Sequence, residues 1–217
     1  MAITPFAHYE LNSNSNDSTG SYNGTDTNIS YWAWWVKWNC ATFNGTNSYF
    51  TLASWFYDNI KARNDYWVSI WINPTSLTWW AVIYSYTAAV DFYAYFSATW
   101  KITMRRWATS NAETWTSVTT WSWQHFVFNY TSSTNVDIYK NWSFVQWITI
   151  AATPNTTSTF NFWKYYNTTF PYNGKMDYID VWVWNLTSWE ISTLYGWWTP
   201  PNYPYTSKNS SWFFALI

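Results

Sequence analysis

The sequence predicts an all-β protein built as a two-sheet antiparallel β-sandwich, and three observations lead to this fold class. Short runs of β-branched and aromatic residues recur at spacings of about 8 to 12 residues, with turn residues between them. Only residues 187–195 have the pattern of a helix, and Thr187 and Glu190 resemble a capping box at its start. The chain has 217 residues, which is long enough to bury the core of one such domain.

The clearest strand pattern lies in the middle of the chain, where three strands follow one another. Residues 124–130 are rich in β-branched and aromatic side chains, and a polar break follows them. Residues 136–140 alternate, with Asp137 and Tyr139 on the face opposite the apolar side chains. Residues 143–148 resume the pattern after a two-residue turn, so we expect a three-stranded antiparallel unit here.

The remaining elements follow from the same patterns, taken in chain order. Expected strands cover residues 7–11, 49–52, 67–73, 81–86, 91–96, 101–106, 114–120, 148–152, 159–164 and 177–184. Pro74 lacks an N–H group and is expected to end the strand before it. Residues 58–65 hold several charges and predict a surface loop. We expect one domain over residues 1–195 and a proline-containing C-terminal tail over 196–217.

Composition argues against several classes of function. The formal net charge is −1 and only 10% of residues are charged, so a nucleic-acid partner is not expected. No apolar run of about 18 residues occurs, so no membrane insertion is expected, and the N-terminus lacks the pattern of a signal peptide. Cys40 is the single cysteine, which excludes a disulfide framework within the chain and leaves the redox compartment open.

Tryptophan and glycine contents are both unusual. The chain has 23 Trp and 5 Gly, whereas roughly 15 Gly would be usual for this length. Trp142 follows Asn141 at a hairpin tip, where glycine is the usual residue. We therefore hypothesise that UGA codons, read as Gly in the source, have been read as Trp. The alternative is a truly Trp-rich protein whose indoles fill the core or stack on sugars. The hypothesis predicts positive φ at Trp38, Trp142 or Trp163.

Several blocks, in order and spacing, resemble the laminin G-like family of concanavalin A-like jelly rolls. Residues 7–20 resemble the opening strand and Asp-containing loop, residues 36–52 a G-x-A-x-x-F-x-G-T-x-x-Y segment, and residues 68–76 an S-x-W-x-x-P strand. Residues 123–145 resemble a W-x-H-V-A…Y-x-N-G unit, and residues 174–195 a closing G-x-x-D-E-V strand with an L-T-x-x-E-I helical turn. Gly in place of Trp at positions 38, 142, 163 and 189 improves the matches. Tyr178 departs from the usual Glu, which leaves that corner open. The resemblance implies a jelly-roll sandwich.

No catalytic residues are expected. The three glutamates, Glu10, Glu113 and Glu190, form no E-x-D-x-x-E strand, and Asp177 and Asp180 are expected to face opposite sides of a strand. The two histidines, His8 and His125, lie in apolar strands and predict core residues bonded to backbone, and Cys40 predicts a buried side chain. We therefore expect a protein that is not an enzyme.

Calcium is the one cofactor considered, because relatives with this jelly roll often bind it at a rim of the sandwich. Asp17, Asn44, Asn47 and Asp177 occupy loops or strand ends and could supply oxygen ligands. The alternative is that these side chains only form Asx-turns.

Aromatic and basic residues supply the other candidate binding sites. Tyr165, Tyr166 and Tyr172 lie in a predicted loop and could stack on sugar rings, or could instead shield an edge of the sandwich. The strand at 101–106 carries three positive charges, which predict either a solvated face or a contact with sulfate or an acidic sugar.

The sequence thus predicts a non-catalytic carbohydrate- or cell-surface-binding module with a glycan or protein partner. The alternative is a structural virion component, such as a phage tail or decoration protein, and a third, less favoured alternative is a glycoside hydrolase. The expected setting is extracellular or virion-associated.

Overall fold

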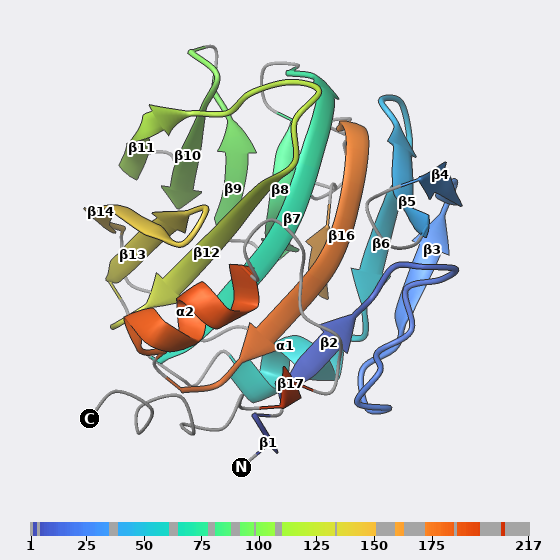
Figure 1. Cartoon of the computed structure of the whole chain (residues 1–217), viewed down its shortest axis with the longest axis horizontal. Coiled ribbons are helices and arrows are strands. Elements are labelled where there is room, and N and C mark those ends of the chain that lie inside the picture. The colour runs from blue at the N-terminus through green and yellow to red at the C-terminus, as the bar shows by residue number, and fades with distance from the viewer. Residues whose placement is uncertain are drawn as a thin grey trace, which may run out of the picture.

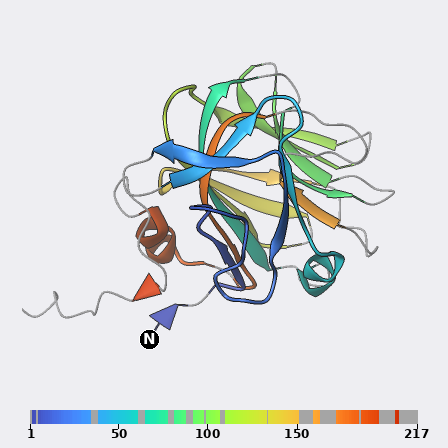
Figure 2. The same ribbon diagram turned by 90° about the vertical axis from the view of Figure 1, so that its right-hand side faces the viewer.

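A computed structural model gives the fold as two antiparallel sheets packed face to face, which confirms the predicted β-sandwich (Figures 1 and 2). The structure describes residues 2–3, 5–34, 39–60, 65–77, 81–87, 92–97, 99–106, 110–132, 134–150, 159–162, 172–184, 186–195 and 205–206.

The first sheet has seven strands. In spatial order they are β11 (Ser110–Ser117), β10 (Lys101–Arg106), β9 (Phe92–Phe96), β8 (Val82–Thr87), β15 (Thr159–Phe162), β6 (Tyr49–Leu52) and β3 (Gly24–Thr27). The second sheet has eight. They are β14 (Ser143–Thr149), β13 (Asn135–Lys140), β12 (Gln124–Tyr130), β7 (Tyr66–Ser76), β16 (Asn173–Trp182), β5 (Asn39–Asn44) and β4 (Ser30–Trp34), with β2 (Ala7–Tyr9) paired to β16.

The main core lies between the two sheets, and strand alternation explains which side chains enter it. In β7, Val68, Ile70 and Ile72 point inward and are fully buried. Phe126 and Phe128 of the neighbouring strand β12 point the same way and join that cluster. The predicted three-stranded unit is confirmed as β12, β13 and β14, paired antiparallel in sequence order.

Helix α2 (Ser188–Tyr195) crosses the outer face of the eight-stranded sheet, in front of β12 and β7 (Figure 1). The predicted helix is confirmed, and its first turn is capped as the sequence suggests. Thr187 N donates to Glu190 Oε2 at 2.8 Å, and Glu190 N donates to Thr187 Oγ1 at 3.3 Å. Leu194 and Ile191 are buried against the sheet. The strands beneath α2 are therefore covered on both faces.

The expectations for residues 58–65 and for Pro74 were wrong. Helix α1 (Ser54–Ile60) occupies the start of the predicted loop 58–65, because Phe56, Tyr57 and Ile60 lie on one helical face and enter the core. Strand β7 continues through Pro74 to Ser76. Its ladder with β16 is irregular at that point and pairs Pro74 with Gly174, so the missing N–H group is accommodated.

The chain ends also pair with each other. Strand β17 (Tyr205–Thr206) lies within the segment predicted as a tail, and it pairs antiparallel with β1 (Ala2–Ile3). Part of that segment is therefore held against the N-terminus.

Candidate functional site

The outer face of the eight-stranded sheet divides into a part covered by α2 and an exposed part beyond it. Under the helix, Trp67 and Trp182 stack with ring centroids 5.0 Å apart. Trp71 stacks on Tyr195, the last residue of α2, at 5.4 Å and an interplanar angle of 7°. These rings are almost completely buried, so they fix the helix to the sheet.

A row of polar side chains is buried on the same covered face. His8 Nδ1 lies 2.7 Å from Asp180 Oδ1, and Ser69 Oγ lies 2.6 Å from His125 Nε2. Burial lowers the pKa of His125 to about 3, so this imidazole stays neutral at physiological pH. Both histidines are core residues, as predicted, but side chains rather than backbone groups are the partners shown for their rings.

The expectation that Asp177 and Asp180 face opposite sides of β16 was wrong. Asp177 lies opposite Trp71 and Asp180 lies opposite Ser69, and these two β7 residues point to the same face. A β-bulge between the two aspartates inserts the extra residue, and Tyr178 within it has a φ of 41°. Spacing along the chain could not reveal this, because a bulge resets the alternation.

Asp177→Asn is expected to raise the free energy of unfolding at pH 7 by on the order of 1 kcal/mol. Burial holds the pKa of Asp177 well above its usual range, and nearby Glu10 raises it further. The folded state therefore holds this proton at pH values where the unfolded chain, with a carboxyl pKa of about 4, has lost it. Stability consequently falls as pH rises through the folded-state pKa. Urea titrations between acidic and neutral pH should show a flatter profile for the variant, and an unchanged profile would contradict this assignment.

The calcium candidates are engaged within their own segments. Both Asp17 oxygens accept hydrogen bonds in the loop between β2 and β3; the donors are His8 N, Thr19 N, Thr19 Oγ1, Ser21 N and Tyr22 N. Asn44 Oδ1 accepts from Thr46 N and Asn47 N, and Asn44 Nδ2 donates to Asn47 Oδ1. Asp177 lies elsewhere, buried in β16. Asp17 and Asn44 thus have the Asx-type bonding considered as the alternative, and calcium binding by these residues stays a prediction.

Asp17→Asn is expected to lower the free energy of unfolding by about 2 kcal/mol, because one acceptor oxygen becomes an NH₂ donor facing N–H and O–H donors. Chemical denaturation measures the loss. Asp26→Asn is the matched control, since Asp26 is exposed and accepts a hydrogen bond from the Tyr31 hydroxyl. Equal losses in the two variants would show that Asp17 has no special role in this loop.

The structure describes one of the three tyrosines predicted to bind sugar. Tyr165 and Tyr166 lie outside the described residues. Tyr172 is fully buried, with its ring 5.8 Å from that of Phe43 and its hydroxyl donating to Lys175 O at 3.0 Å. Tyr172 is therefore a core residue, and its ring is not available for stacking on a ligand.

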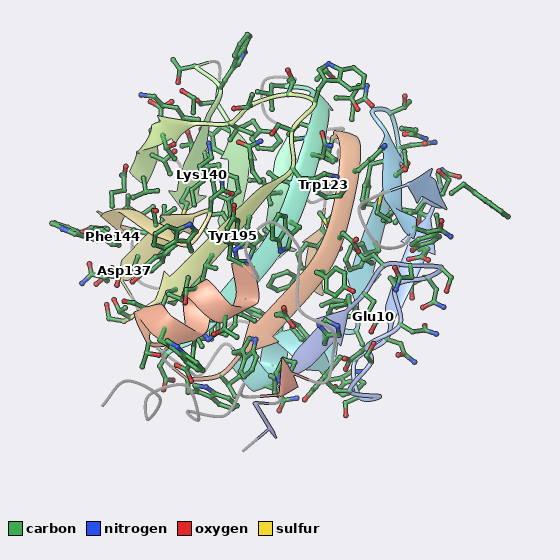
Figure 3. The ribbon with its side chains drawn as sticks, in the orientation of Figure 1. Glu10, Trp123, Asp137, Lys140, Phe144 and Tyr195 are labelled. Carbon is green, nitrogen blue, oxygen red and sulfur yellow. The ribbon has the colours of Figure 1, made fainter. Side chains whose placement is uncertain are left out.

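The exposed part of the outer face offers a different set of side chains. We define the hairpin face as the outward side chains Asp137 and Tyr139 of β13 and Phe144 and Trp147 of β14. Asp137 lies directly opposite Trp147, and Tyr139 lies opposite Phe144. Phe144 is 53% exposed and Trp147 is 65% exposed. Figure 3 shows Asp137 and Phe144 together at the left-hand edge of the sheet, beyond α2.

The rings and the carboxylate of the hairpin face influence one another. The Tyr139 and Phe144 rings meet edge to face, with centroids 5.4 Å apart. Partial burial raises the pKa of Asp137. Burial also raises the pKa of Tyr139, and the nearby Asp137 charge adds to that rise. The hairpin face thus combines apolar ring surface with a carboxylate that is partly removed from water.

Part of the hairpin face could have been found from the sequence. Alternation already placed Asp137 and Tyr139 together on the outward face of one strand. The position of Phe144 depends on a register shift between Ile138 and Tyr139, which the sequence does not show. Sequence reasoning instead favoured tyrosines in a polar loop.

In the described part of the chain, no group of three or more His, Cys, Asp or Glu side chains is placed to hold a metal ion. Within the same ranges, no helix has the length and apolar character required to cross a lipid bilayer.

Comparisons with known proteins find similar solved structures. No family model matches the chain, and no curated protein matches its sequence. Domain 4 of the extracellular arabinanase AbnA from Geobacillus stearothermophilus, solved with arabinotriose, has a TM-score of 0.73 at 21% identity; the match covers 89% of this chain and 99% of that one.

Two larger proteins contain a similar domain. The binding domain of botulinum neurotoxin serotype G has a TM-score of 0.67 at 13% identity, and the match covers 90% of this chain and 51% of that one. Trypanosoma rangeli sialidase has a TM-score of 0.67 at 11% identity, covering 87% of this chain and 32% of the sialidase. The chain therefore spans about half or less of these two proteins. At such identities, the likenesses establish that this chain shares the two-sheet jelly-roll sandwich fold.

Proposed function

We propose that this chain is a non-catalytic recognition module that binds glycans through the hairpin face. The observation that carries the proposal is the pairing, across two strands, of exposed aromatic rings with a half-buried carboxylate. The C–H faces of sugar rings stack on phenyl, phenol and indole surfaces. A carboxylate accepts hydrogen bonds from ligand hydroxyl groups and fixes the orientation of the stacked ring.

The structural neighbours support this class of function in general terms. One was solved with arabinotriose, and another botulinum binding domain, of serotype DC, was solved with rat synaptotagmin II. A glycan or a protein is therefore a reasonable partner class for the fold, and the ring surface of the hairpin face favours a glycan. We propose an extracellular or virion-associated setting, in keeping with the extracellular enzyme that carries the first of these domains.

We also propose that the chain is a laminin G-like jelly roll in which several Trp positions are glycine in the natural protein. Trp142 has a φ of 64°, as the codon hypothesis predicts, and Trp100 and Trp121 have values of 62° and 59°. Only glycine adopts such angles freely. Trp38 and Trp163 lie outside the described residues. Sequencing the gene at codons 100, 121 and 142 tests this directly: UGA supports the proposal, and UGG at all three contradicts it.

Phe144→Ala is expected to weaken glycan binding at least tenfold, about 1.4 kcal/mol, because a stacking surface is lost. Isothermal titration with neutral oligosaccharides, arabinotriose first, measures the affinity. Trp32→Ala is the control, since Trp32 is 87% exposed on β4, at the opposite edge of the same sheet. Equal affinities for the wild-type protein and Phe144→Ala would remove the hairpin face from the proposal.

A further inference from the structure

We infer that the hairpin face selects neutral glycans and rejects those that carry carboxylate or sulfate groups. The inference rests on the proposed function and adds the chemical class of the ligand to it.

The Asp137 carboxylate is the one charged group of the hairpin face, and a second oxygen acceptor lies beside it. Asn129 of β12 lies directly opposite Asp137, on the same outward side of the sheet. Asn129 is 3% exposed, and its Oδ1 atom accepts no hydrogen bond from any described group. Two neighbouring residues with oxygen acceptors call for a ligand that donates, and sugar hydroxyl groups donate. An anionic group would offer only further acceptors.

No cation in the described part of the chain compensates the Asp137 charge at this surface. Lys140 is close in sequence but points to the other side of the strand, as Ile138 does. Its Nζ atom donates to Ser117 O at 2.7 Å and lies 5.9 Å from the centre of the Phe126 ring. A ligand carboxylate or sulfate beside Asp137 would therefore meet like charge, and partial burial of Asp137 weakens solvent screening of that repulsion.

The basic strand β10 is a separate element from the hairpin face. It belongs to the seven-stranded sheet, where it lies between β9 and β11, whereas the hairpin face belongs to the outer side of the other sheet. Contact with an acidic sugar at β10, left open by the sequence, would be a separate site. The test must therefore separate the two surfaces by substitution.

A second copy of the chain is the competing occupant. Strand β14 is the edge strand of its sheet in the described structure, and its exposed rings could pair with those of another molecule. The Asp137 carboxylate favours a sugar over a second copy of the chain, because self-association through this face would bring two Asp137 carboxylates close to each other. Dimerisation is accordingly an outcome that the test must detect.

The experiment compares oligomers of galactose and of galacturonic acid with the same linkage and length, which differ at one substituent of each ring. Titrations with the wild-type chain are expected to show at least tenfold tighter binding of the neutral oligomer. Asp137→Asn should reduce the ratio to about threefold or less, since it removes the charge and keeps the shape. Asp26→Asn, an exposed acidic control on β3, should leave the ratio unchanged.

The possible outcomes distinguish failure of this inference from failure of the proposed function. Equal or tighter binding of the uronate, or an unchanged ratio in Asp137→Asn, overturns charge selection at the hairpin face and leaves glycan binding standing. No binding of any glycan, together with dimerisation that Phe144→Ala abolishes in analytical ultracentrifugation, overturns both. A preference for the neutral oligomer that is reduced in Asp137→Asn supports both the inference and the proposed function.

Discussion

Gly174→Ala is expected to lower the free energy of unfolding by about 3 kcal/mol or more, because the added methyl group has no room. A Cβ atom at this position would lie 2.6 Å from Asn73 O, 2.6 Å from the Tyr172 hydroxyl oxygen and 2.7 Å from Pro74 Cα. Two of these atoms belong to the β7 backbone, so the clash cannot be relieved by a side-chain rotation. Strands β7 and β16 would have to separate where the ladder is already irregular.

Gly20→Ala provides the matched control. Gly20 also has a positive φ, 87°, but a Cβ atom there would have no neighbour within 4 Å. We expect a loss of about 1 kcal/mol, which reflects backbone strain alone. Urea denaturation of both variants gives the comparison. If Gly174→Ala costs no more than Gly20→Ala, the close approach of β7 and β16 at Pro74 is not a constraint on the fold.

The combined change Trp100→Gly, Trp121→Gly and Trp142→Gly is expected to raise the free energy of unfolding by about 3 kcal/mol in total. All three residues have left-handed backbone angles, with φ between 59° and 64°, and their indoles are at least half exposed. Asn141, with a φ of 48°, precedes Trp142 in the two-residue turn between β13 and β14. Asn-Gly is the usual sequence for that turn, so glycine relieves strain and removes little packing.

Trp182→Gly is the control of opposite sign. Trp182 is 1% exposed and stacks on Trp67, so its loss should cost about 3 to 5 kcal/mol. Thermal and urea unfolding should therefore separate two classes of tryptophan in one chain. A triple variant less stable than the wild-type protein would contradict the view that these turns were built for glycine.

Strand alternation and capping chemistry explain why much of the fold was predictable. The Val136 and Ile138 pattern gave the orientation of β13 correctly, because one face of that strand is buried and the other is not. Thr187 and Glu190 gave the start of α2, because the capping box is a local interaction that tertiary contacts did not override.

The features that escaped prediction depend on contacts between distant segments. Pro74 is tolerated inside β7 because Gly174, a hundred residues later, leaves space beside it. Asp177 and Asp180 share a face because a bulge in β16 interrupts alternation. Neither fact is encoded locally, so the missing N–H group of Pro74 and the alternation of Asp177 and Asp180 each gave the wrong answer.

The candidate site was only partly accessible from sequence. Asp137 and Tyr139 were correctly placed on one outward face, but nothing local indicated that Phe144 would lie opposite Tyr139. Tyr172 looked like a loop residue, yet the core between the sheets contains its ring. Exposure of an aromatic ring is a property of packing, and composition does not reveal it.

Nuclear magnetic resonance with a neutral oligosaccharide tests the central claim most directly. Backbone amide shifts recorded during titration with arabinotriose should change in residues 135–149 and at Asn129, and should saturate. Residues of the β5–β6 turn, such as Asn44 and Asn47, should not change. Saturable shifts at that turn or elsewhere, with none on the β13–β14 hairpin, would contradict glycan recognition by the hairpin face.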